Sequence, residues 1–377
     1  MEKEDIKAIF LIIIMLVLIA ILAVFGVNIY WKLTGNESTV LEIFEEGFSH
    51  IPNDNQQTQN ILANDIENQE SSELDKVEIP GEQKEETITS NKKYFYNQLN
   101  SYSKTIYEKI LNNKENMKSG TYKLEFGEAF NDLLGQENGA ELLQDYYQSA
   151  VETYLNDNPD VFYMDPTKMY LNIKTIKKVF YTTYDVYIDC GKMPNYLSDE
   201  FNSKQEILEA EEKIKNEVDK LVAKINRGTD YEKILMAHDY LVNNCSFDET
   251  LQKNNIYNLY GAIVNKEAVC EGYTKAFKYL MDEIEIECVM VIGTATNSEK
   301  ITESHAWNYI NLNNKWYAID VTWDDPIVRG HGYVGNDVKY KYFLKGSKVM
   351  DKDHFKSGQF TEDGQVYTYP TLSINDY

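Results

Sequence analysis

Three side chains, Cys270, His305 and Asp320, stand in the order and local contexts that a thiol acyl-transfer enzyme needs. Cys270 immediately precedes a stretch in which apolar residues recur on one face of a 3.6-residue repeat, which predicts a helix. A cysteine in the first turn of a helix directs its sulfur at unpaired N–H groups and at the positive end of the dipole, which favours the thiolate. Cys270 is therefore a candidate nucleophile. The apolar face comprises Tyr273, Phe277, Leu280, Met281 and Ile284.

The other two side chains lie in segments 304–312 and 315–322, which alternate between apolar and polar residues as strands do. Asn313 and Asn314 separate the two segments. Asparagine tolerates the positive φ angles of a tight turn, so the sequence predicts a β-hairpin with a two-residue loop.

The expected register of this hairpin brings His305 and Asp320 together. With a two-residue loop, Trp307 lies opposite Asp320 and His305 lies opposite Thr322. His305 and Asp320 are then diagonal neighbours on one face, about 7–8 Å apart at the backbone, which imidazole and carboxylate can bridge. A shift by one residue would put them on opposite faces. The pattern thus predicts a base and its orienting carboxylate to accompany the nucleophile.

Each of these residues also has an ordinary structural explanation. Cys270 can be a small core residue, His305 a polar strand residue and Asp320 a turn acid. The hairpin geometry, combined with a cysteine at a helix start, favours the catalytic interpretation over three independent structural ones.

The segments around these residues resemble a known family. They read Val-Cys-Glu-Gly-Tyr-Thr-Lys-Ala-Phe at 269–277, Ser-His-Ala-Trp-Asn-Tyr at 304–309 and Trp-Tyr-Ala-Ile-Asp-Val-Thr-Trp-Asp-Asp-Pro at 316–326. All three are similar to the core of the transglutaminase-like superfamily of papain-type folds, and the resemblance covers about residues 231–342. It implies an α+β core in which a helix bearing the cysteine packs on an antiparallel sheet bearing the histidine and aspartate.

The same resemblance implies roles for the three side chains. Cys270 would be the nucleophile, His305 the general base and acid, and Asp320 the orienting carboxylate. The superfamily contains protein cross-linkers, peptidases and glycan-releasing amidases, so the resemblance implies the chemistry more closely than the substrate. It implies no metal or organic cofactor.

Two further aromatic residues are candidates for the cleft or the oxyanion site. The backbone N–H of Cys270 is a natural oxyanion donor at a helix start, and the Tyr260 hydroxyl is a candidate second donor. Trp307 is a candidate cleft wall, because the expected register places it opposite Asp320. Ordinary packing is the alternative for both rings.

Composition restricts the partners. The chain has 37 basic and 61 acidic residues, for a net charge of −24, which argues against a nucleic-acid partner because phosphate binding needs a basic face. The spacing of His238 and Cys245 on one helix face is too long to hold a metal ion without other ligands. Asp324 and Asp325 are explained by a turn rather than by calcium. The four cysteines are expected to be reduced.

The N-terminal part predicts a membrane anchor. After a short tail at residues 1–7, residues 8–27 carry no charge and are long enough to span a bilayer, and interfacial Tyr30 and Trp31 extend the anchor to 8–31. A cleavable signal peptide is the alternative, but the acidic start and the length of the run favour a retained anchor. The lysines that precede the span favour an extracellular C-terminal part.

The rest of the chain divides into three expected regions. Residues 35–91 carry a net charge of −12 and few aromatic residues, which predicts a disordered acidic linker. Residues 92–228 predict a helix-rich extension, with helices at 94–111 and 142–155, strands within 169–190, and an amphipathic helix that a Ser203–Glu206 capping box opens. Residues 229–377 predict the catalytic domain. Its first helix, opened by a Thr229–Glu232 capping box, extends to about Asn244.

These patterns together predict a membrane-tethered cysteine enzyme that acts on peptide or protein amide bonds, with cell-wall peptide as one possible substrate. A catalytically idle surface-binding module and a protease anchored on the cytoplasmic face are the alternatives. An intact set of three groups favours an enzyme, since a binding module has no need of them in register. The identity of the second nucleophile, water or an amine, stays open.

Overall fold

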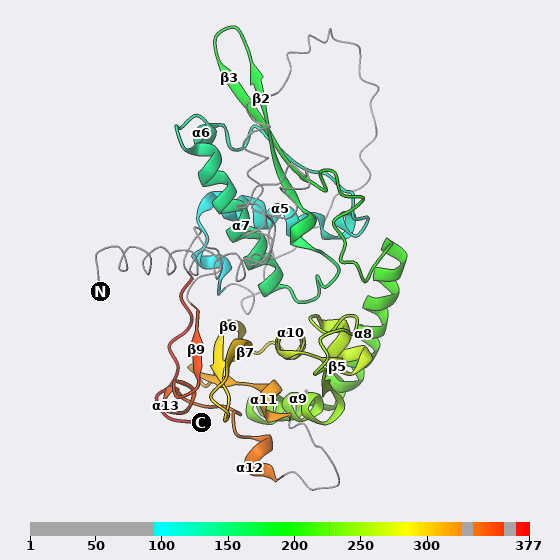
Figure 1. Ribbon diagram of the computed structural model, residues 1–377, viewed down its shortest axis with the longest axis vertical. Coiled ribbons are helices and arrows are strands. Elements are labelled where there is room, and N and C mark those ends of the chain that lie inside the picture. Colours follow the sequence, from blue (N-terminus) through cyan, green and yellow to red (C-terminus); the bar gives the residue numbers. More distant parts are fainter. Residues whose placement is uncertain (1–93, 226, 326–334, 358–366) are drawn as a thin grey trace, which may run out of the picture. The chain divides into compact units, whose positions relative to one another are not determined.

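The computed structural model describes residues 94–225, 227–325, 335–357 and 367–377. Figure 1 gives the labels of their helices and strands. None of the helices in these ranges is long and apolar enough to cross a bilayer. The predicted anchor at residues 8–31 and the predicted linker at residues 35–91 lie outside the described residues, as does the tail at 1–7.

The first described region combines helices with a small sheet. The sheet is antiparallel, in the order β1-β3-β2, and the predicted strands within 169–190 are its β2 and β3. The predicted helix at 94–111 is α5, which begins later because the Asn100 side chain accepts the Ser103 N–H and caps the helix there. α5 also extends further than predicted, to Met117. The elements are η2 (Tyr96–Gln98), α5 (Ser101–Met117), β1 (Leu124–Gly127), α6 (Asn131–Leu134), α7 (Gly139–Asp157), η3 (Pro166–Lys168), β2 (Tyr170–Lys177) and β3 (Thr182–Asp189).

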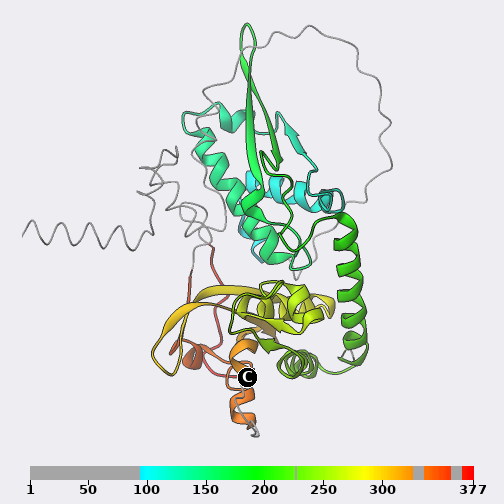
Figure 2. The same ribbon diagram turned by 45° about the vertical axis from the view of Figure 1, so that its right-hand side comes forward.

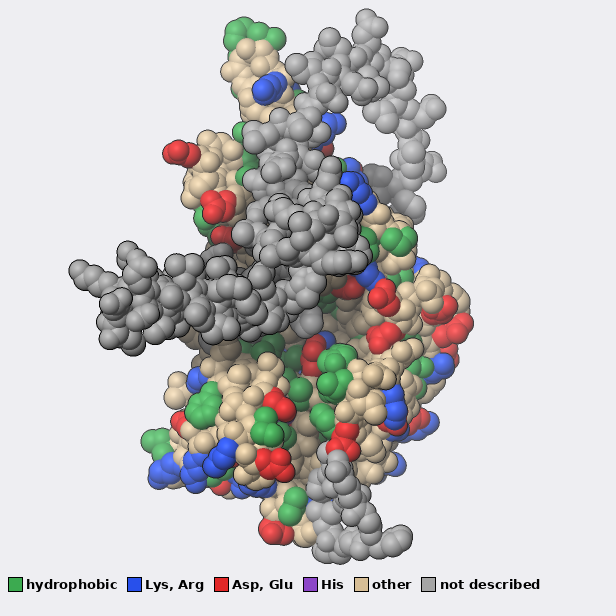
Figure 3. Space-filling model, in the orientation of Figure 1, with side chains coloured by type: hydrophobic (Ala, Val, Ile, Leu, Met, Phe, Trp, Pro, Cys, Tyr) green, Lys and Arg blue, Asp and Glu red, His purple; other side chains and the backbone are tan. Residues whose placement is uncertain are grey.

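The hairpin of β2 and β3 is long, and both ribbon views show its tip projecting from the helices (Figures 1 and 2). Val179 and Phe180 at the tip are 89% and 94% exposed. Figure 3 shows hydrophobic side chains at this end of the molecule beside a basic one. The tip therefore takes no part in the apolar core, which β2 and β3 join only through residues such as Leu171 and Val186.

Two helices connect this region with the next, and both begin where capping residues predict. The Ser203 hydroxyl accepts the Glu206 N–H at the start of α8 (Lys204–Ile225), while the Glu206 carboxylate accepts from Asn202 instead of Ser203. Thr229 and Glu232 form a full capping box at the start of α9 (Asp230–Asn244). α9 ends at Asn244, as predicted.

The second region is built on a four-stranded antiparallel sheet in the order β8-β7-β6-β9. α10 packs on β6 and β7, and its predicted apolar face is buried. The mixed helix-and-sheet class expected from the sequence is therefore present. The elements are β4 (Ser246–Phe247), the π-helix η4 (Gly261–Asn265), β5 (Glu267–Ala268), α10 (Cys270–Glu283), β6 (Cys288–Thr296), β7 (Thr302–Leu312), β8 (Lys315–Ile319), α11 (Val321–Asp324), α12 (Asn336–Lys339), α13 (Ser347–Met350) and β9 (His354–Lys356).

The hairpin of β7 and β8 has the predicted turn and the predicted register. Asn313 and Asn314 have φ angles of 55° and 60°, and Asn308 pairs with Ile319. The second strand is shorter than predicted, however, because pairing stops at Ile319. The Asp320 side chain accepts the Trp323 N–H and caps α11, so the chain turns into a helix where the sequence predicted three more strand residues.

Candidate active site

Cys270 is the first residue of α10, as predicted, and follows an extended Val269. It is half-buried, and its thiol is free. The N–H groups of a first helical turn have no partner within the helix, and they lie at the positive end of its dipole. The position therefore offers a thiolate both hydrogen-bond donors and a favourable field.

His305 and Asp320 are in direct contact. The distance from His305 Nε2 to Asp320 Oδ2 is 2.8 Å, and both residues are buried. His305 lies in the first half of β7, and Asp320 is the residue after β8. The predicted diagonal contact is therefore present, although the predicted cross-strand pairs of Trp307 with Asp320 and of His305 with Thr322 lie beyond the last strand pair. The N-cap turn, rather than strand pairing, sets the final position of the carboxylate.

The electrostatics of this pair favour a charged histidine. Burial alone lowers the pKa of His305, but the charge of Asp320, the hydrogen bond to it and the nearby Cys270 thiol together raise it to about 10. Burial raises the pKa of Asp320, but the charge and hydrogen bond of His305, with help from His354, hold it well below its usual range. Because Nε2 of His305 is used by Asp320, Nδ1 is the nitrogen left for Cys270.

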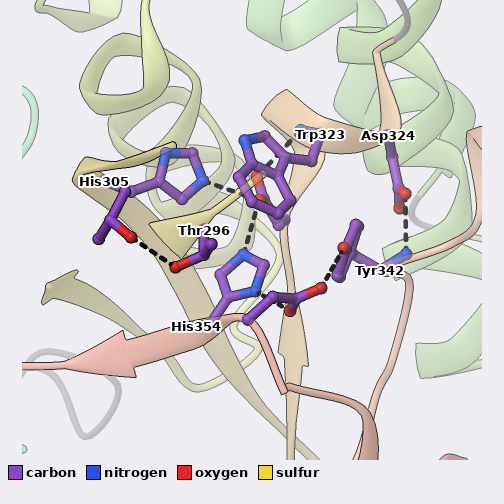
Figure 4. A network of polar contacts seen from close by, with 9 residues as sticks. Thr296, His305, Trp323, Asp324, Tyr342 and His354 are labelled. Atoms are coloured by element: carbon purple, nitrogen blue, oxygen red, sulfur yellow. Dashed lines mark hydrogen bonds and ion pairs between the residues drawn. The ribbon is translucent and has the colours of Figure 1, made fainter. Parts of the chain in front are cut away.

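A second histidine, His354, contacts the same carboxylate and was missed in the sequence. Its Nε2 lies 3.1 Å from Asp320 Oδ2, and its side chain is buried. Figure 4 shows His305 and His354 reaching this network from different strands. His354 lies 34 residues after Asp320, in a strand of only three residues, so neither spacing nor periodicity indicated it.

The three polar side chains also form a set of possible metal ligands. One ligand atom from each of His305, Asp320 and His354 lies within 4.8 Å of the other two. In this structure Nε2 of each imidazole hydrogen-bonds to the carboxylate.

Two tryptophan side chains lie beside the imidazole rings. Trp307, the predicted cleft wall, is 1% exposed and lies with its ring 6.0 Å from that of His305 and 5.1 Å from that of His354. Trp307 therefore backs the histidines and offers no open surface to a ligand. Trp323 is only partly buried, and its ring centroid lies 5.2 Å from that of His305. The aromatic side chain beside His305 that is open to solvent is Trp323, which the sequence did not single out.

Tyr260 lies among other groups. Its hydroxyl is 3.4 Å from Lys213 Nζ, and its ring contacts those of Phe162 and Phe201. These contacts favour the packing explanation, and the role of Tyr260 as an oxyanion donor stays a prediction.

The remaining cysteines and His238 occupy structural positions. Cys190, Cys245 and Cys288 are free thiols, as expected, and burial raises the pKa of Cys245 to about 12. His238 is fully buried, and its Nε2 contacts Asp324 Oδ2 at 3.1 Å. No metal cluster that includes His238 or Cys245 occurs among the described residues.

Part of the chain matches a known protein family. Residues 219–321 match the model of the transglutaminase-like superfamily, so this part of the chain is a transglutaminase-like domain. The match contains Cys270, His305 and Asp320 and ends just after the last of them. No curated protein matches the sequence significantly.

Two solved structures are similar to the chain at low identity. One is described as the crystal structure of a TGase, with 14% identity, a TM-score of 0.29 and coverage of 53% of this chain. This chain covers 56% of that protein. The other is described as a "putative cysteine protease from Cytophaga hutchinsonii", with 13% identity, a TM-score of 0.23, and coverage of 42% of this chain and 68% of that one. The domain assignment rests on the family model.

Proposed function

We propose that this protein is a cysteine enzyme that transfers or hydrolyses the acyl group of peptide or protein amide bonds, with Cys270, His305 and Asp320 as its catalytic residues. The observation that carries the proposal is the placement of a free thiol at the start of α10 beside a buried His305–Asp320 pair. The match to the transglutaminase-like superfamily supports the same chemistry.

The first half-reaction uses each group in turn. With the pKa of His305 raised to about 10, the imidazole carries a proton at neutral pH and stabilises a Cys270 thiolate. The thiolate attacks the carbonyl carbon of the amide, and the Cys270 N–H donates to the developing oxyanion. His305 then gives its Nδ1 proton to the leaving amine, the C–N bond breaks and a thioester forms.

The second half-reaction reverses these roles. Water or a primary amine attacks the thioester carbonyl while His305 Nδ1 accepts its proton. The C–S bond breaks, and Cys270 leaves as a thiolate that is again paired with the protonated imidazole. Asp320 holds Nε2 throughout, so the ring keeps the orientation that presents Nδ1 to the sulfur.

The proposal also covers the substrate class of the enzyme and its location in the cell. A peptide or protein substrate, with cell-wall peptide as one possibility, fits an enzyme held by residues 8–31 in the membrane and displaced from it by an acidic linker at residues 35–91. The lysines before the span favour an extracellular catalytic domain. Protease added to intact cells should then release a fragment that begins near residue 92. Release only after lysis would place the domain in the cytoplasm.

A screen of acyl donors tests the activity itself. The full chain in detergent is incubated with protein and peptide substrates, with and without a fluorescent primary amine, and the products are identified by mass spectrometry. Amine incorporation indicates transamidation, and cleavage or deamidation without added amine indicates hydrolysis. If no acyl donor forms a thioester on Cys270, and the chain binds such peptides unchanged, the idle binding module becomes the better explanation.

A further inference from the structure

The Asp320 carboxylate is held by more donors than an orienting carboxylate requires. Oδ2 lies 2.8 Å from His305 Nε2 and 3.1 Å from His354 Nε2, and Oδ1 accepts the Trp323 N–H at 3.1 Å. The side chain is 1% exposed, so it has little water to replace a missing donor. Its orientation towards His305 therefore depends on the groups that hold its other lone pairs.

His354 is itself fixed by a chain of hydrogen bonds. Its Nδ1 lies 2.7 Å from Asp353 Oδ1, and Asp353 Oδ2 accepts the Tyr342 hydroxyl at 2.7 Å (Figure 4). The Tyr342 carbonyl in turn accepts the Asp320 N–H at 3.3 Å. Asp320, His354, Asp353 and Tyr342 thus form a closed ring of hydrogen bonds that includes the N-cap of α11.

The sheet is built so that His354 can reach this carboxylate. On β6, Gly293 pairs with His305 on one side and Ala295 pairs with His354 on the other. Paired residues share a face of the sheet, so only a glycine and an alanine of β6 lie between the two histidines. A Cβ at Gly293 would lie 2.2 Å from the Phe355 carbonyl oxygen, so a larger residue there would push β9, which carries His354, away from β6.

Packing alone does not account for a histidine at this position. The rings of Trp307, Trp323 and Tyr342 lie 4.7 to 5.1 Å from the His354 ring, an apolar surrounding that a phenylalanine would fill. The imidazole instead lies between two carboxylates, of Asp320 and Asp353, and presents one nitrogen to each. Phenylalanine would fill the same space but would remove one hydrogen-bond partner from each of these buried or partly buried carboxylates.

We propose that His354 is a positioning residue, which holds the Asp320 carboxylate in the orientation that supports His305 and, through it, the Cys270 thiolate. The inference rests on the proposed function, because it assigns His354 a role in the same site. His354 acts only through Asp320, and it does not touch the reacting atoms.

Alkylation of Cys270 by iodoacetamide at pH 6 tests this role without a known substrate. The full chain is compared as wild type, His354→Phe, His354→Gln, Asp320→Ala and the double variant Asp320→Ala/His354→Phe. Phenylalanine fills the aromatic surrounding without a donor, and glutamine retains an N–H that can donate to Asp320. Mass spectrometry measures the labelling rate at Cys270, and thermal unfolding measures the stability of each variant.

We expect His354→Phe to slow the labelling by about 10- to 100-fold, the scale of a lost hydrogen bond to a charged group. His354→Gln should recover part of that rate. The double variant should label at the rate of Asp320→Ala, because His354 then has no carboxylate to position. Equal rates in wild type and His354→Phe, or independent effects of the two substitutions, would overturn the inference and leave the proposed function intact. A wild type that resists labelling at pH 6 would overturn both.

Discussion

His238 Nε2 lies 3.1 Å from Asp324 Oδ2, and both side chains are fully buried. Asp324 ends α11, and Asp320 caps its start, so each end of this short helix is tied to a histidine from another element. His238 lies on α9 and His305 lies on β7, so these contacts connect α11 to both elements. The Tyr342 N–H also donates to Asp324, at 2.8 Å. α11 is thus fixed at both ends by buried polar contacts, which keeps the Asp320 N-cap in place.

Replacing His238 with leucine should destabilise the fold strongly. The substitution leaves the buried Asp324 carboxylate without its histidine, and the loss of one partner of a buried pair typically costs about 3–5 kcal/mol. Urea denaturation of the full chain measures the change in the free energy of unfolding. The matched control is His238→Leu combined with Asp324→Asn, which removes the charge but keeps an acceptor for the Tyr342 N–H. If the single variant is as stable as the control, the contact carries no such energy.

Replacing Cys270 with alanine should abolish labelling and turnover while the stability stays close to that of the wild type. The side chain is half-buried at a helix start, so little packing is lost. Cys190→Ala provides the control, because Cys190 is also a half-buried free thiol but lies outside the site. Iodoacetamide labelling and thermal unfolding of both variants check this prediction. If Cys190→Ala loses the labelling and Cys270→Ala keeps it, Cys190 is the reactive thiol and the assignment of Cys270 is wrong.

Replacing Asp320 with asparagine should reduce kcat by orders of magnitude without unfolding the chain. Asparagine keeps an acceptor for the Trp323 N–H, so α11 keeps its cap. Its side chain no longer stabilises a protonated His305, and in a serine-protease triad the same change lowers kcat by about 10⁴-fold. Once an acyl donor is known, kcat and KM of the variant measure the loss. Turnover near that of the wild type would remove Asp320 from the mechanism.

The contribution of the His305–Asp320 pair to the free energy of unfolding should depend on pH. The pKa of His305 is raised from 6.5 to about 10 in the folded state, so its stabilising contribution is complete below pH 6.5 and is lost as the pH rises towards 10. The lowered pKa of Asp320 gives a contribution that is present above its usual value of 3.8 and is lost in acid. The stability difference between wild type and Asp320→Asn should therefore be largest between about pH 4 and 6.5. Urea denaturation at pH 5.5, 8 and 9.5 should show it decreasing at each step.

The sequence predicted the parts of this site that local rules define. The helix after Cys270, the Asn313–Asn314 turn and the register of its hairpin follow from periodicity and from turn chemistry, and each is present. The end of β8 at Ile319 was predicted wrongly, because an aspartate cap competes with strand pairing at Asp320 and prevails. His354 and the partners of His238 depend on contacts between distant segments, which no local pattern encodes.

Replacing Gly293 with alanine should disturb the site through β9. A Cβ at Gly293 would lie 2.2 Å from the Phe355 carbonyl oxygen and 2.8 Å from the Lys356 Cα, so β9 would have to move away from β6. Because β9 carries His354, the shift should withdraw its imidazole from Asp320 and slow the alkylation of Cys270 at pH 6 as His354→Phe does. Gly135→Ala is the control, since Gly135 has helical backbone angles and its nearest neighbour would lie 3.3 Å from the new Cβ. If Cys270 of the Gly293→Ala variant is alkylated at the wild-type rate, β9 can move without disturbing Asp320, and the predicted link between β9 and the site is wrong.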